Sequence, residues 1–347
     1  MAEIFSELPF ATTSLKEWQQ AASHELEGAD PFKKLTASAS ELPVKPYYDS
    51  SNATPTPGFE LAAGANPFLG PRQWMNLPKI MVDDAQQANQ QALEYLNSGA
   101  DGILFECFTP TLDFNRLLAE IKPEFCNLSF VSTGEFDTGG LQAWVERNQA
   151  HSIHGAIFQT HPKSSLPYAH FYPAGILVKP NSNPIEEIAA ALAAAVQVLD
   201  QSSPNTIHQI AFSLPIQTHL FQELAKLKAL RMLWYQIQGA YGVELKSVHI
   251  HAYSEAWPAP DYQPHGNMIK STTACLAAIL GGCDSVTILA EKPDQVMMNR
   301  IARNVSSILR EESYLHKVAD PIAGSYFIDS LVTELAEKAW HKFQQGV

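Results

Sequence analysis

The stretch SVHIHA, residues 247–252, predicts a β-strand whose two faces differ in kind. Val248 and Ile250 lie on one face and His249 and His251 on the other, because side chains alternate along a strand. Seven further short apolar stretches have the same strand character. They begin near residues 78, 102, 127, 155, 174, 209 and 285. The chain is therefore expected to contain eight strands.

Helical patterns follow most of these strands, and the alternation of the two decides the fold class. The clearest patterns cover residues 84–98, 184–199, 218–238, 267–280 and 296–312. Strand–helix units repeated over about 260 residues predict an α/β fold, a single (β/α)8 TIM barrel, which typically needs about 250 residues. A doubly wound open sheet is the alternative. No GxGxxG or Walker-type loop follows any strand, which weakens a nucleotide-binding open sheet.

Polar side chains occupy the inner face of this predicted barrel. Strands of parallel barrels are normally apolar on both faces, but several strands here alternate, and their apolar set must face the covering helices. The remaining set, which then faces the axis, includes Ser129, Ser213, Thr287 and the two histidines. Such an axis either has room for a long, partly polar ligand or holds polar groups that hydrogen-bond one another.

Glu106 is the unusual member of the inner set. By strand parity it shares a face with Leu104 and points into the axis, which the two side chains would narrow. Burying an ionised carboxylate without a partner costs several kcal/mol. We therefore expect Glu106 either to be protonated through a raised pKa or to pair with His249 or His251.

Composition limits the classes of partner and the compartment. The 347 residues are 46% hydrophobic, which is ample for a large core, and carry a net charge of −13. This charge argues against nucleic acid and against an anionic membrane as general partners. No stretch approaches the roughly 18 apolar residues of a membrane span, and the N-terminus has no leader pattern, so a cytoplasmic location is expected. The four cysteines are scattered without a CxxC pair, which indicates neither a disulfide framework nor a zinc site.

Residues 1–71 are expected to form an N-terminal helix and an extended intersubunit arm, and residues 72–347 the barrel. A capping-box pattern from Ser14 to Glu17 begins the helix, which stops before Pro31. The following segment is rich in Pro, Ser, Thr and Ala and is typical of an irregular arm.

Two other chemistries fit single features of the sequence. His249 and His251 share a strand face and could bind a metal, but no carboxylate cluster accompanies them. Lys79 or Lys179, near strand ends, could form a Schiff base. The polar run from residue 251 to residue 267 falls where TIM barrels keep their functional loops, at the C-terminal mouth. None of these features alone assigns a function.

A stiff connector near the C-terminus carries more information. In VADPIAGSY, residues 318–326, Pro321 restricts Asp320 and Gly324 permits a left-handed backbone, so a fixed turn is expected between two helices. Together with RIARN from residue 300 and EES from residue 311, this stretch closely resembles the end of the barrel in the methylmalonyl-CoA mutase family. The run NMIKSTTACLAAILGG from residue 267 resembles that family as well. The resemblance implies a TIM barrel with the pantetheine arm of coenzyme A along its axis.

The departures from the family pattern concern its active site. Lys79 stands where the family has a tyrosine, and ILVKPNSNP, residues 176–184, lacks the family's Tyr-His pair. His251 matches the substrate-contacting histidine, while Tyr253 replaces a nearby glutamine. Nothing matches the DxHxxG motif of the cobalamin module. The resemblance therefore implies no catalytic residue, no metal and no bound cofactor in this chain.

Some family members are heterodimers of a large catalytic chain and a small chain with a degenerate site, and this sequence resembles the small chain. The implied partner is the large subunit, which would carry adenosylcobalamin; a homodimer is an assembly open to the chain alone. The alternative is an active acyl-CoA mutase, or another TIM-barrel enzyme, with a rebuilt mouth that uses His251. The candidate channel residues are His249, His251, Tyr253, Ser129, Ser213, Thr287 and Glu106.

Overall fold

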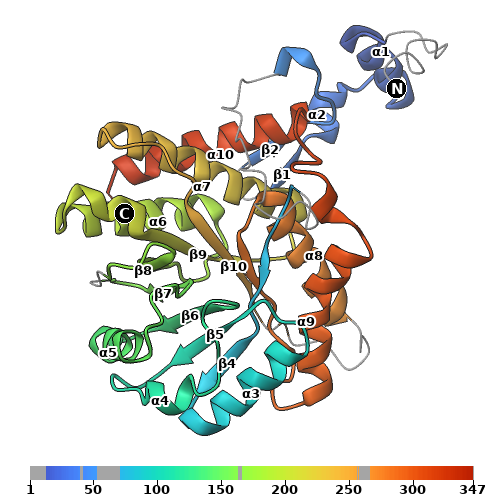
Figure 1. Cartoon of the computed structure of the whole chain (residues 1–347). Helices are drawn as coiled ribbons and strands as arrows, with labels where there is room; N and C mark the ends of the chain where they lie inside the picture. The colour runs from blue at the N-terminus through green and yellow to red at the C-terminus, as the bar shows by residue number, and fades with distance from the viewer. Residues whose placement is uncertain are drawn as a thin grey trace.

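The computed structural model of the chain describes residues 13–39, 42–52, 71–162, 166–255, 257 and 266–346. Its main body is a parallel sheet in the order β3-β11-β10-β9-β8-β7-β6-β5-β4. The strands are β3 (Met75–Asn76), β4 (Lys79–Val82), β5 (Gly102–Cys107), β6 (Asn127–Ser132), β7 (Gly155–Gln159), β8 (Phe171–Leu177), β9 (Ile210–Ile216), β10 (His249–Ser254) and β11 (Ser285–Thr287). Figure 1 shows helices packed around the outside of this curled sheet.

The sheet closes on itself through an interrupted first strand. β3 and β4 are separated only by Leu77 and Pro78; β3 pairs with β11, and β4 pairs with β5. The interruption is bridged on both sides, because Leu77 N donates to Val286 O and Leu104 N donates to Pro78 O. The (β/α)8 TIM barrel is confirmed, and the doubly wound open sheet is wrong.

Helices follow most of the strands, as expected, although the described residues between β7 and β8 contain no helix. The helices are α3 (Ala85–Asn97), α4 (Phe114–Leu117), α5 (Thr138–Asn148), α6 (Pro184–Asp200), α7 (Leu220–Ala240), α8 (Gly266–Gly281), α9 (Val296–Glu311) and α10 (Tyr326–Gln344). Local chemistry fixes their starts: α6 has Pro184 in its first turn, and Asn183 caps it by accepting from Ile185 N. The outward apolar residues of the strands, such as Phe212 and Ile250, lie in the core beneath these helices, as predicted.

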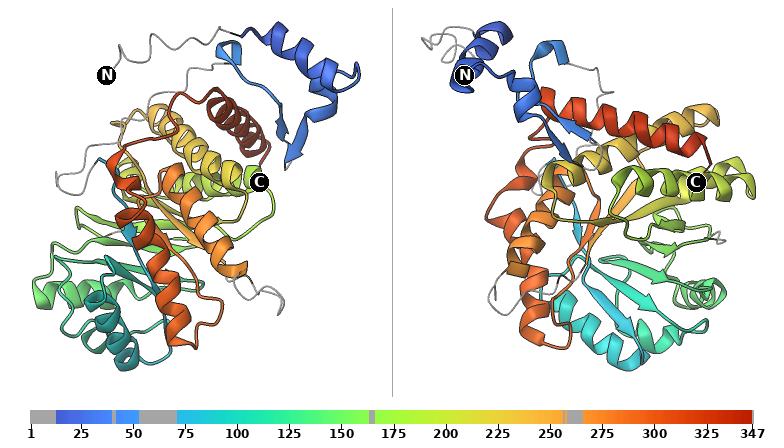
Figure 2. Two further views of the ribbon diagram at one scale, coloured as in Figure 1. Left: turned by 90° about the vertical axis from the view of Figure 1, so that its right-hand side faces the viewer. Right: turned by 180° about the vertical axis from the view of Figure 1, so that it is seen from behind.

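The N-terminal arm is attached to the barrel at one end only. The capping box of α1 (Leu15–Glu25) is present, and no residue of that helix is buried. α2 (Pro31–Leu35), β1 (Ala37–Ala39), β2 (Leu42–Val44) and η2 (Ser50–Asn52) follow it. Leu42 is fully buried in the core, and the Tyr48 ring lies 5.2 Å from that of Phe327 on α10. α1 itself stands away from the barrel (Figures 1 and 2).

The connector before α10 is the fixed turn that its sequence predicts. Ile322 N donates to Asp320 Oδ1, and Gly324 has a φ of +80°. Lys228 of α7 forms an ion pair with Asp320, which ties the turn to the barrel wall. Within the described ranges, every helix is too short or too polar to cross a membrane.

Candidate functional site

His251 lies in the middle of a relay, a chain of hydrogen bonds that runs along the inner face of the barrel wall. Its Nδ1 is 2.8 Å from Ser213 Oγ on β9, and its Nε2 is 2.9 Å from Thr287 Oγ1 on β11. Thr287 Oγ1 in turn donates to the carbonyl oxygen of Leu77, at 2.5 Å, where the first strand is interrupted. The relay therefore joins four neighbouring strands along the inner face: β9, β10, β11 and the interrupted first strand.

The direction of the relay fixes the protonation of His251. The Thr287 hydroxyl donates its hydrogen bond to Leu77 O, so it can only accept a hydrogen bond from His251. The proton of the neutral His251 ring is therefore on Nε2. Nδ1 is then an acceptor and receives a hydrogen bond from the Ser213 hydroxyl. Burial, with a smaller effect of His249, lowers the pKa of His251 to about 3, so the ring stays neutral. Both ring nitrogens are occupied within the protein.

The polar groups deeper in the barrel are paired in the same way. His249 Nε2 lies 2.9 Å from Ser285 Oγ, and burial lowers the pKa of His249. Ser129 Oγ donates to Asn127 Oδ1 at 2.6 Å and accepts from a backbone amide of β7. Of the two alternatives for the polar axis, these residues follow the second, since they hydrogen-bond one another.

Glu106 has a different partner from the one expected. Its Oε2 is 2.8 Å from Lys79 Nζ, and both side chains are about a quarter exposed, at 24% and 25%. The pairing of Glu106 with His249 or His251 is therefore wrong. Parity does point Glu106 inward, but at the C-terminal mouth, where the neighbouring strand places Lys79 beside it. A lysine paired in this way is also a poor candidate for a Schiff base.

A cavity of about 370 Å³ opens at this mouth. Its polar lining includes Lys79, Glu106, Ser213, His251, Tyr253, Ser254, Glu255 and Thr287, and its apolar lining includes Leu104, Val131, Leu177 and Leu289. Of the predicted channel residues, the cavity brings together Glu106, Ser213, His251, Tyr253 and Thr287. His249 and Ser129 lie outside its lining. Residues 256 and 258–265 of the predicted mouth loop lie outside the described residues.

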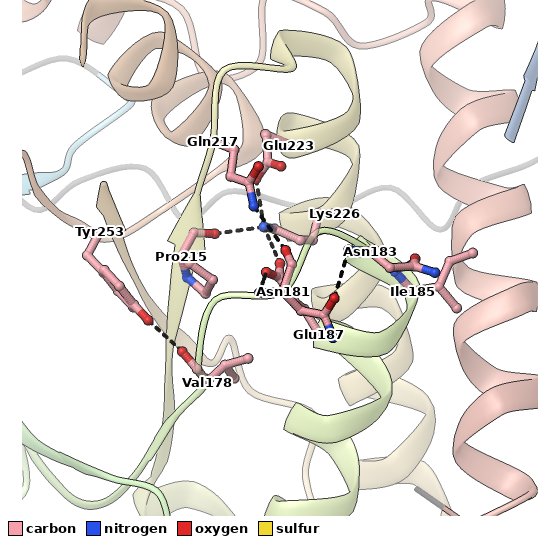
Figure 3. A network of polar contacts seen from close by, with 10 residues as sticks. All are labelled: Val178, Asn181, Asn183, Ile185, Glu187, Pro215, Gln217, Glu223, Lys226 and Tyr253. Carbon is pink, nitrogen blue, oxygen red and sulfur yellow. Dashed lines mark hydrogen bonds and ion pairs between the residues drawn. The ribbon is translucent and has the colours of Figure 1, made fainter. Parts of the chain in front are cut away.

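Tyr253 joins the cavity wall to a buried charge network. Its hydroxyl donates to Val178 O at 2.6 Å, as Figure 3 shows, and burial raises its pKa. Beyond Val178 the loop reaches Asn181, whose backbone amide donates to Glu187 Oε1. The loop in which the family carries its Tyr-His pair is thus held from both sides.

Lys226 on α7 is the centre of this network, and sequence reasoning missed it. Its Nζ donates to Glu187 Oε2 at 2.6 Å and to Pro215 O at 2.7 Å, and it forms an ion pair with Glu223 Oε2 at 2.6 Å. Lys226 is fully buried, and Figure 3 shows the carboxylates converging on it. Burial raises the pKa of Glu187, and the nearby ammonium opposes that shift. Only the i,i+3 spacing of Glu223 and Lys226 was available as a signal.

The sequence of the chain was compared with known protein families and with individual proteins. A family model described as Methylmalonyl-CoA mutase matches residues 178–346. A relative named methylmalonyl-CoA mutase small subunit, from Porphyromonas gingivalis, is 27% identical over 98% of this chain. Residues 178–346 of the chain are therefore similar to the methylmalonyl-CoA mutase family.

Other relatives match a smaller share of the chain at higher identity. A Streptomyces virginiae protein named as the small subunit is 35% identical over 46% of this chain, and the Escherichia coli methylmalonyl-CoA mutase is 33% identical over 46%. The chain spans less than two thirds of these relatives: 63% of the P. gingivalis protein and 28% of the S. virginiae protein.

Proposed function

We propose that this chain is the small, non-catalytic subunit of a cytoplasmic, heterodimeric methylmalonyl-CoA mutase. It would support a large subunit that interconverts methylmalonyl-CoA and succinyl-CoA. The observation that carries the proposal is the saturated relay: His251, which matches the family's substrate-contacting histidine, has both nitrogens hydrogen-bonded to Ser213 and Thr287. A general acid or base needs a free site and a pKa near the working pH, and His251 has neither. The catalytic alternative that uses His251 has no observation in its favour.

The cofactor belongs on the partner in this proposal, because the residues described here do not fit a cobalamin. The mouth cavity of about 370 Å³ is near the small end of ligand pockets and too small to enclose a corrin ring. His251, the histidine among the described residues of its lining, has no free nitrogen for cobalt. No catalytic step is therefore assigned to this chain.

Co-expression with a large mutase chain tests the role directly. The two chains are expected to elute together in size-exclusion chromatography, and the purified small chain with adenosylcobalamin is expected to form no succinyl-CoA. Measurable succinyl-CoA formation by this chain alone would overturn the proposal.

The arm supplies a prediction about assembly. Deleting residues 1–30 removes α1 but keeps Leu42 and Tyr48, which anchor the arm to the barrel. Trp18 of α1 packs on Phe32 and Tyr47 of the arm, but no residue of α1 is buried. We therefore expect α1 to dock on the large chain, and its loss to weaken the heterodimer at least about tenfold. Analytical ultracentrifugation measures the change. Gln20→Ala, an exposed change in the same helix, is the control; an unchanged dissociation constant after the deletion would contradict the docking role.

The axis supplies a prediction about coenzyme A. The channel candidates His249, His251 and Ser129 are hydrogen-bonded to their neighbours, and Leu104 and Glu106 line the mouth cavity. We therefore expect methylmalonyl-CoA to bind weakly or not at all, and Glu106→Ala combined with Leu104→Ser to restore part of the binding. Calorimetric titration is the measurement. Tight binding by the unmodified chain would show an open channel and would favour the catalytic alternative.

A further inference from the structure

Three hydroxyl groups in the lining of the mouth cavity donate hydrogen bonds to other groups of the protein. Ser213 donates to His251 Nδ1, Thr287 donates to Leu77 O, and Tyr253 donates to Val178 O. A hydroxyl that already donates its hydrogen bond within the protein can only accept a hydrogen bond from a ligand. Three of the hydroxyls that line this cavity therefore act as acceptors toward its interior.

The charged groups of the cavity point the same way. One ammonium, Lys79, and two carboxylates, Glu106 and Glu255, line it, and the ammonium is already held 2.8 Å from Glu106. A bound anion would have to compete with Glu106 for Lys79 and would also meet Glu255, which forms no ion pair with any residue that the structure describes. A ligand with N–H donors instead finds acceptors on several sides.

We infer that the mouth cavity is a binding site for a small organic ammonium ion with a short apolar chain. The leucine and valine side chains of the wall, Leu104, Val131, Leu177 and Leu289, would cover the chain. The ammonium group would donate to Glu106 Oε atoms and to the free lone pairs of Ser213 and Thr287, as charge-assisted hydrogen bonds. The volume of about 370 Å³ suits a compact ligand. This inference concerns the same mouth cavity as the acyl-CoA titration above, but a different class of ligand, and it does not rest on the proposed subunit role.

A size-matched panel tests the inference on the full chain. n-Butylammonium, n-butanol and n-butyrate differ in the head group and share the chain, so titration followed by amide shifts in NMR spectra separates charge from apolar burial. We expect n-butylammonium to bind most tightly, with a dissociation constant on the order of 1 mM, given its few heavy atoms. The shifts are expected at Tyr253 and Thr287. Stronger binding of n-butyrate to the unmodified chain would overturn the inference.

Two substitutions are expected to change n-butylammonium affinity in opposite directions. Glu106→Gln should weaken n-butylammonium binding about tenfold, a modest value for a charged hydrogen bond, and should turn the preference toward n-butyrate by freeing Lys79. Lys79→Met should strengthen n-butylammonium binding, so the result does not depend on one variant that fails to fold. Glu135→Gln removes an exposed carboxylate outside the cavity lining and is the matched control. An equal loss of n-butylammonium affinity in Glu135→Gln would show that only the net charge of the protein matters, and it would contradict the proposed site.

Discussion

Replacing Lys226 by methionine is expected to lower the free energy of unfolding by about 3–5 kcal/mol, the usual cost of removing one partner of a buried ion pair. The substitution leaves Glu187 and Glu223 facing each other in the core without the ammonium that both contact at 2.6 Å. It also leaves Pro215 O without its donor. Urea denaturation followed by circular dichroism measures the change.

The reason for this cost can be checked with a second substitution. Adding Glu187→Gln to Lys226→Met removes one of the unpaired carboxylates, and we expect it to recover part of the lost free energy of unfolding. Lys246→Met is the control for the charge change, because Lys246 pairs with Glu244 at the surface, where such pairs contribute about 0–1 kcal/mol. An equal loss of stability in Lys226→Met and Lys246→Met would show that burial of the network does not matter.

Acid is expected to destabilise the fold before most of its carboxylates titrate. Burial lowers the pKa of His251 to about 3 and also lowers the pKa of His249, whereas an unfolded histidine titrates near pH 6.5. Below pH 6.5 these two histidines therefore bind protons in the unfolded chain but stay neutral in the folded chain. The free energy of unfolding consequently falls as the pH falls. His251 alone should contribute about 1.4 kcal/mol per pH unit in this range.

The useful window lies between pH 6.5 and about pH 4.5, above the usual range of aspartate and glutamate. Within it Glu187 acts in the opposite direction, because its pKa is raised and protonation relieves its burial. The lowered pKa of Asp284 has its effect only at lower pH. Chemical denaturation at several pH values gives the slope. His251→Gln should flatten it, while His24→Gln, an exposed change in α1, should leave it unchanged; an identical slope in all three proteins would contradict the role of the buried imidazole.

Strand parity predicted the fold and much of the site, because a period of two residues is written directly in the sequence. It placed His251, Ser213 and Thr287 on one inner face, where the relay joins them. It failed for Glu106, since parity gives the direction of a side chain but not its height along the barrel or its neighbour on the next strand. Lys226 could not be found at all, because the depth of a helix position depends on which elements cover it.

The interrupted first strand has a consequence for how the protein is made. β3 finds its neighbour in β11, and the hydrogen bond from Thr287 to Leu77 joins residues 210 positions apart. During synthesis the first strand therefore keeps one edge unpaired until the ribosome has released most of the chain. Contacts of such long range are slow to form, and open edges favour aggregation. Because β11 is synthesised long after β3, we expect the pairing of these two strands, which closes the barrel, to be the folding step that benefits most from a chaperone.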